Sequence, residues 1–255
     1  MIYSPSSVHT TLSSGVEVVI DEQTNYPFEE QICFTISFPD RKQKSAEFPL
    51  ELRIPAWSKG YSLVVKGKDM AGEEVITDAQ AVREGTIKIN RTWKDGDKIT
   101  LQLNAEVTSS RWWDDAAVIE RGPLVYALRM EENWHKHVCE GDDIARYGTH
   151  YYEVTSPTKW NLALIADNLK QENIASSFVV EKGECSVTPW SLESAPIAIK
   201  AKAYTLPDWV MERNSAGSFN FLNQMKDTEE TSEQVEITLI PYGCTTLRIT
   251  EFPVR

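Results

Sequence analysis

The sequence predicts an all-β protein of two tandem antiparallel β-sandwich domains with little helix. In the first part of the chain, apolar and polar side chains alternate with a period of two, as in half-buried strands, at residues 16–20, 32–38, 50–54 and 99–103. Turn-forming groups of Asn, Asp, Pro and Gly separate these runs. No helical pattern of about ten residues lies between them, which favours a sandwich over alternating strand–helix units.

A β-hairpin is expected near the end of the first domain. The pair Asp95-Gly96, typical of short hairpin turns, lies between the runs 86–92 and 98–103. The second run is therefore predicted to fold back onto the first.

Aromatic residues are expected to close the ends of the first core. Pro55 removes a backbone donor and ends a strand, and Trp57 follows it at the edge of the core. Arg91 shares its strand face with Trp93, so its aliphatic stem is expected to lie over apolar neighbours.

The second half of the chain shows the same strand pattern less cleanly. Two polar stretches, 131–150 and 213–233, are expected to be surface excursions. Strands are predicted at residues 118–128, 197–204, 235–240 and 246–250. Gly122-Pro123 is expected to bend the chain on entry to the buried part of the first of these.

Residues 161–173 are the one candidate for a helix. Leu162, Ile165 and Leu169 fall at helical spacing, but residues 160–165 fit a strand equally well. The pattern leaves both alternatives open.

The boundary between the domains is predicted where the last clean alternating run ends and an aromatic-acidic cluster begins. This gives a first domain of residues 1–110 and a second of residues 111–255. The alternative boundary lies after Arg129 and would assign the strand at 118–128 to the first domain.

Charge and composition argue against several classes of function. The formal net charge of -12 repels phosphate backbones and anionic membranes, so neither nucleic acid nor a membrane is an expected partner. The four cysteines stand far apart without a C-x-x-C pair, which argues against a zinc ribbon or a disulfide framework. No secretion signal opens the sequence, but one could precede this segment in a longer parent protein, so the location, periplasmic or cytoplasmic, stays open.

Several segments, taken together, are specific to one family. The segments are TNYPF at 24–28, LELRIPAW at 50–57, RTWKDGD at 91–97, ERGPLVYAL at 120–128, and the closing LIPYG at 239–243, LRI at 247–249 and FP at 252–253. In this order and spacing they resemble the region after the catalytic barrel in family 127 of the glycoside hydrolases, the β-L-arabinofuranosidase-like proteins.

The resemblance implies an α/α barrel that carries the chemistry, followed by two β-sandwich domains to which this chain corresponds. The family's cysteine nucleophile, its acid/base glutamate and its zinc site lie in that barrel, so no catalytic residue and no cofactor is predicted in this chain. Its expected partners are the barrel, a second copy in a homodimer, and plant-type glycans that contain arabinose. The chain alone is predicted to be catalytically inactive.

The segment around His135, His137 and Cys139 is the strongest candidate for a metal site. In an extended segment the three side chains share one face. Zinc usually takes four ligands, and no second group of ligands stands nearby in the sequence. A solvated polar loop is the expected alternative, and no metal site is predicted.

Trp112, Trp113 and Asp114 are the candidates for contact with a sugar. Indole rings stack on the apolar face of a sugar while carboxylates bond its hydroxyls, which would suit a carbohydrate-binding module. The alternative is that the two tryptophans pack a domain junction or dock the barrel.

A small hydrolase with an unrecognised carboxylate site is the third hypothesis. Paired acidic residues occur at several positions, but sequence neighbours on a strand point to opposite faces, so adjacency does not indicate a shared cleft.

Overall fold

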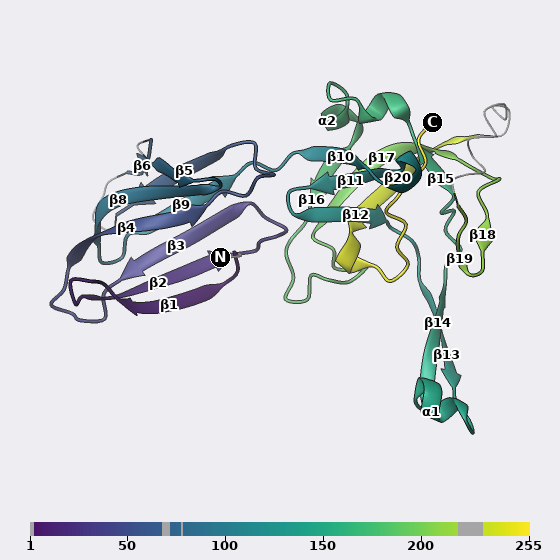
Figure 1. Ribbon diagram of the computed structural model, residues 1–255, viewed down its shortest axis with the longest axis horizontal. Helices are drawn as coiled ribbons and strands as arrows, with labels where there is room; N and C mark the ends of the chain where they lie inside the picture. The colour runs from purple at the N-terminus through teal and green to yellow at the C-terminus, as the bar shows by residue number, and fades with distance from the viewer. Residues whose placement is uncertain (1–2, 68–71, 78, 219–231) are drawn as a thin grey trace. The chain divides into compact units, whose positions relative to one another are not determined.

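The computed structural model describes residues 3–67, 72–77, 79–218 and 232–255. By its internal contacts the chain divides into two compact units, Met1–Glu106 and Val107–Arg255. Strands dominate both units, and the described residues contain only two short α-helices (Figure 1). The all-β prediction is therefore confirmed. None of the described helices combines the length and the apolar character needed to cross a membrane.

The first unit contains two sheets in which every strand pairing is antiparallel. The larger has the order β1-β2-β3-β9-β5-β6 and the smaller the order β4-β8-β7. The strands of the larger sheet span Ser6–Thr11 (β1), Glu17–Thr24 (β2), Gln31–Ser37 (β3), Tyr61–Lys66 (β5), Glu74–Val75 (β6) and Lys98–Leu103 (β9). Those of the smaller span Ser45–Arg53 (β4), Gln80–Arg83 (β7) and Thr86–Lys94 (β8).

The core of the first unit consists of the inward residues of both sheets. Strand β3 follows the predicted alternation, since Ile32, Phe34 and Ile36 are buried while the residues between them are partly exposed. Trp93 of β8 is fully buried, and its indole N–H donates to the carbonyl of Phe48 on β4 at 3.0 Å. This bond satisfies the one polar atom of a large buried ring.

Arg91 lies beside this core much as predicted. Its guanidinium carbon is 5.8 Å from the centroid of the Trp93 ring, and its Nη1 forms an ion pair with Glu74 at 2.8 Å. Trp57 is half-buried and stacks on Tyr26, with the ring centroids 6.4 Å apart.

The predicted hairpin between residues 86–92 and 98–103 is wrong. Strand β8 pairs with β4 and β7, whereas β9 pairs with β3 and β5, so the turn at Asp95-Gly96 joins the two sheets. The turn is bonded to β3: Gly96 N–H donates to the Ile36 carbonyl at 2.8 Å, and Asp95 accepts from Phe38 N–H at 3.0 Å. A turn motif sets the local backbone, whereas packing decides which strand becomes the partner.

The second unit is built on a seven-stranded antiparallel sheet of order β10-β11-β12-β20-β17-β15, with β16 paired to β17. Its strands span Val107–Arg111 (β10), Ala117–Arg121 (β11), Leu124–Leu128 (β12), Leu162–Leu164 (β15), Val179–Lys182 (β16), Ile197–Thr205 (β17) and Gln234–Pro241 (β20). Strands β11 and β12 form the predicted segment 118–128. Gly122, with a φ of 58°, bends the chain between them, as expected.

The polar stretch 131–150 contains regular structure. Strands β13 (Asn133–Val138) and β14 (His150–Thr155) form a two-stranded hairpin, with helix α1 (Asp143–Tyr147) at its tip (Figure 1). This segment, residues 131–155, is called the arm below. A second small hairpin joins β18 (Met211–Glu212) to β19 (Ser215–Ala216), and residues 219–231 of the other polar stretch lie outside the described residues.

The structure decides one alternative left open in this unit and contradicts one prediction. Residues 161–173 form no continuous helix: they contain strand β15 and the 3-10 turn η2 (Ala166–Leu169), and helix α2 (Ile174–Ser177) follows. The strand alternative for 160–165 is the correct one, because β15 pairs with β17. The predicted strand at residues 246–250 is wrong: Glu132 accepts the backbone N–H groups of Thr246 and Leu247, and only Ile249 is bonded to the sheet, through Leu128 N–H at 2.8 Å.

Candidate functional site

The chain around Trp112 and Trp113 forms a tight turn between β10 and β11. Ala116 N–H donates to the Trp113 carbonyl at 3.1 Å, and both central residues have positive φ, 52° at Asp114 and 59° at Asp115. These are the features of a type I′ turn, which Asp tolerates better than most residues. The turn geometry alone therefore accounts for an aspartate at position 114.

The three residues predicted to contact a sugar differ in exposure and in surroundings. Trp113 is 80% exposed at the tip of the turn, next to Asp114, whereas Trp112 is 59% exposed and lines a groove. The indole N–H of Trp112 donates to Ser110 Oγ at 2.9 Å, which orients the ring. Of the three candidates, Trp112 is the one that lines this groove.

That surface, called the Trp112 groove below, lies wholly within the second unit and has a volume of about 400 Å³. Val118, Pro123, Leu124 and Val125 make it largely apolar. The remaining lining residues are Tyr242, Gly243, Thr250 and Glu251. The groove thus combines two exposed aromatic rings with a hydroxyl and a carboxylate.

Tyr242 is the functional candidate that sequence reasoning missed. It follows β20 in the 3-10 turn η5 (Tyr242–Cys244), and the Arg248 guanidinium lies over its ring, 4.4 Å from the centroid. A Cβ at Gly243 would lie 2.7 Å from Trp190 Cε3, so the close approach of Trp190 requires glycine there. The only sequence signal for Tyr242 is its place in the segment LIPYG, which indicates family resemblance and not a binding role.

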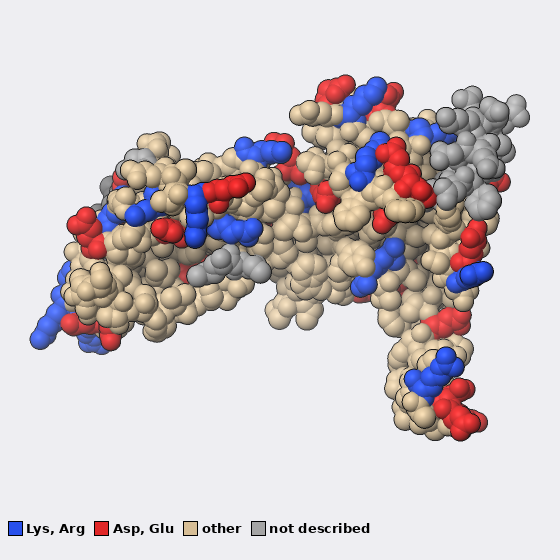
Figure 2. Space-filling view, viewed as in Figure 1, with Lys and Arg blue, Asp and Glu red and all other residues tan. Residues whose placement is uncertain are grey.

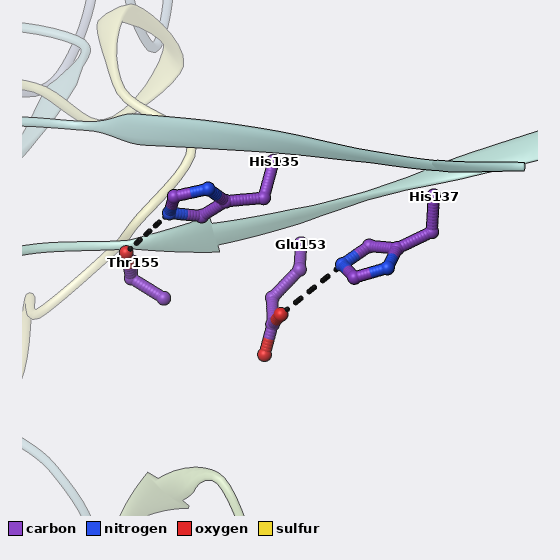
Figure 3. A network of polar contacts seen from close by, with 4 residues as sticks. All are labelled: His135, His137, Glu153 and Thr155. Atoms are coloured by element: carbon purple, nitrogen blue, oxygen red, sulfur yellow. Dashed lines mark hydrogen bonds and ion pairs between the residues drawn. The ribbon is translucent and has the colours of Figure 1, made fainter.

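The candidate metal ligands lie on the exposed arm. His135 Nε2 is 3.3 Å from Thr155 Oγ1, and His137 Nε2 is 3.3 Å from Glu153 Oε2 (Figure 3). Cys139 is buried. Across the described ranges, no three His, Cys, Asp or Glu side chains are grouped so that they could hold a metal ion.

A second cavity, of about 430 Å³, lies within the first unit and contains a buried carboxylate. Glu22 is 5% exposed, and its burial raises its pKa even though Ser4 N–H donates to its Oε1 at 2.9 Å. Period-2 alternation predicts this position, because Glu22 shares its strand face with Val18 and Ile20. Sequence reasoning stopped at Ile20 and missed it.

Three carboxylates line this cavity, and only that of Glu22 is buried. Glu51 and Glu84 also line it, but both are exposed at its rim. The buried Tyr3 hydroxyl donates to the Arg53 carbonyl, and burial raises the pKa of Tyr3 to about 12. A tyrosine with that pKa stays protonated at neutral pH and supplies no base.

Charged side chains give no sign of a phosphate-binding surface on the face drawn in Figure 2. Lys and Arg are interspersed with Asp and Glu there and form no continuous basic patch. The electrostatic footprint that binds a nucleic-acid backbone is therefore missing from that face.

Comparison with known proteins connects the fold to a family. Residues 1–105 match the model described as Beta-L-arabinofuranosidase, GH127 middle domain. None of the curated proteins compared with the sequence matches it significantly.

Solved structures share the fold of the whole chain. The chain aligns over 100% of its length with a GH127 β-L-arabinofuranosidase from Geobacillus stearothermophilus, at a TM-score of 0.59 and 20% identity, and covers 33% of that protein. It aligns over 100% with a GH127 β-arabinofuranosidase (TM-score 0.60, 17% identity, 34% of that protein covered). A structure described as a glycoside hydrolase matches over 99%, at a TM-score of 0.56 and 20% identity, with 35% of its length covered.

The chain therefore spans about a third of the length of the solved structures it matches. At such identities the structural likeness establishes the fold alone, whereas the family match covers the first unit. Residues 1–105 thus match the GH127 middle domain of the β-L-arabinofuranosidase type, and the chain as a whole shares the fold of about a third of the length of the solved structures.

Proposed function

We propose that this chain is the non-catalytic β-sandwich portion of a β-L-arabinofuranosidase-like glycoside hydrolase, that it packs against a catalytic α/α barrel, and that it supports dimerisation. The match of residues 1–105 to the GH127 middle domain carries this proposal. The glycosidase names of the structural neighbours support it.

The arm is the surface best suited to a protein contact. On one face Trp134 packs edge-on against Tyr152, and on the other Tyr151 lies between Tyr147 and His137. Trp134 and the three tyrosines are each about half exposed. An isolated two-stranded hairpin is only marginally stable in water, so a partner that covers these rings would stabilise it.

Sedimentation equilibrium of the full chain tests the dimerisation proposed here. We expect a monomer–dimer equilibrium at roughly 10–100 μM protein. The double variant Trp134→Ser/Tyr151→Ser, which removes one ring from each face of the arm, should be monomeric at the same concentrations. Val187→Ser changes an exposed apolar residue elsewhere in the same unit and should leave the equilibrium unchanged. A wild-type protein that stays monomeric up to millimolar concentration would contradict this part of the proposal.

A further inference from the structure

The geometry points to a binding site for a neutral sugar ring in the Trp112 groove, with Trp112 and Tyr242 as its aromatic walls. This site goes beyond the packing and dimerisation proposed above and does not depend on them. Its ligand class is a neutral glycan, of which one ring enters the groove.

The two aromatic side chains are exposed, and each has a contact that orients its ring. Trp112 and Tyr242 are 59% and 45% exposed, and both line the same groove. The bond to Ser110 fixes the indole, while Arg248 lies over the Tyr242 ring. Because these side chains are already ordered, little rotamer entropy is lost on binding. A ligand that gains little free energy from its contacts, such as a sugar, can therefore still bind.

The shape of the groove agrees with a small ligand. Its volume of about 400 Å³ falls within the range of roughly 300–1,000 Å³ that is usual for small-molecule sites. Pro123 and Val125, the more exposed of the apolar lining residues, supply apolar surface for the C–H groups of a sugar ring.

The polar groups of the groove select against charged sugars. Glu251 and Thr250 offer oxygen atoms that accept hydrogen bonds from sugar hydroxyls, and Thr250 also donates one. Glu251 is the one charged side chain of the lining and would repel a uronic acid or a phosphorylated sugar, a repulsion that Arg248, over the Tyr242 ring, offsets only in part. The net charge of -12 acts in the same direction.

Calorimetric titration of the full chain tests the site, with arabinan oligosaccharides as the neutral probe and oligogalacturonate as the anionic one. We expect a Kd of about 1 mM for the neutral probe, which corresponds to about -4 kcal/mol. The anionic probe should bind at least tenfold more weakly. Trp112→Ala and Tyr242→Ala should each weaken the neutral interaction by about tenfold, as expected when an aromatic stacking partner is lost.

Trp113→Ala is the matched control, because it removes an exposed indole from the same turn but not from the groove. Its affinity should equal that of the wild type, and circular dichroism should show that all three variants are folded. Three results would overturn the site. The first is no heat of binding at 10 mM neutral oligosaccharide, about ten times the expected Kd. The others are an equal loss of affinity in the Trp113 and Trp112 variants, or tighter binding of the anionic probe than of the neutral one. The Trp112 and Tyr242 variants should keep the monomer–dimer equilibrium of the wild type in sedimentation. A loss of sugar binding can therefore be distinguished from a loss of dimerisation.

Discussion

Trp93→Ala is expected to lower the free energy of unfolding of the first unit by about 3–5 kcal/mol, the usual cost of deleting a large aromatic side chain from a core. Trp93 is fully buried, packs against Phe48 with the ring centroids 6.1 Å apart, and donates its indole N–H to the Phe48 carbonyl at 3.0 Å. Its loss would leave a cavity and a carbonyl without its donor. It would also remove the ring beneath Arg91.

Urea denaturation followed by far-ultraviolet circular dichroism measures this effect. Trp93→Phe keeps a ring but loses the hydrogen bond, so its loss should be smaller, about 1–3 kcal/mol. Trp113→Ala removes an exposed ring and should change the transition by less than about 0.5 kcal/mol. Equal stability of the Trp93→Ala and Trp113→Ala variants would show that Trp93 does not support the core.

Glu132→Ala is expected to destabilise the second unit by about 1–2 kcal/mol and to loosen the base of the arm. Glu132 accepts hydrogen bonds from Thr245 Oγ1, the backbone N–H groups of Thr246 and Leu247, and the Trp134 indole. One carboxylate thus ties the arm to the segment after η5. Without this carboxylate, the donors would bond to water, and the arm would be held mainly by the pairing of β13 with β14.

The effect of Glu132 should depend on pH. Partial burial acts to raise its pKa, but the hydrogen bonds from Thr246, Thr245 and Leu247 outweigh this and lower it. Since the folded pKa lies below the unfolded value of about 4.3, the stabilisation is present above that pH. It is lost as the pH falls through the folded pKa.

The measurement compares wild type and Glu132→Ala in urea at pH 7 and near pH 3. The difference should be largest at pH 7 and shrink at the lower pH. Glu131→Ala removes an exposed carboxylate one residue away and serves as the control. A difference that stays constant between the two pH values would mean that the charged form of Glu132 does not hold the arm.

Local sequence rules predicted the inward faces of the first unit well. Alternation in β3 indicated which side chains of Ile32, Phe34 and their neighbours are buried, because this pattern depends on one strand alone. The same rules failed for Asp95-Gly96, where hydrogen bonds to Ile36 and Phe38 direct the chain into the other sheet. Such contacts join residues far apart in sequence and leave no local signal.

The candidate site, too, could be predicted only in part from local sequence. Trp112 was predicted from its residue type and its acidic neighbours, but its separation from Trp113 depends on the turn geometry at Asp114. Tyr242 joins Trp112 only through the fold, because β20 pairs with β12 in the middle of the sheet. Glu22, by contrast, was within reach of simple alternation from Val18.

Assay of the purified chain against nitrophenyl arabinofuranosides tests the central claim, that this portion is non-catalytic, most directly. A full-length GH127 β-L-arabinofuranosidase serves as the positive control, and zinc is added in a parallel series. We predict no release of nitrophenol above the enzyme-free blank in either series, while the control enzyme turns over. Turnover clearly above the blank that co-elutes with the chain on gel filtration would contradict the account and place a catalytic site within these two units.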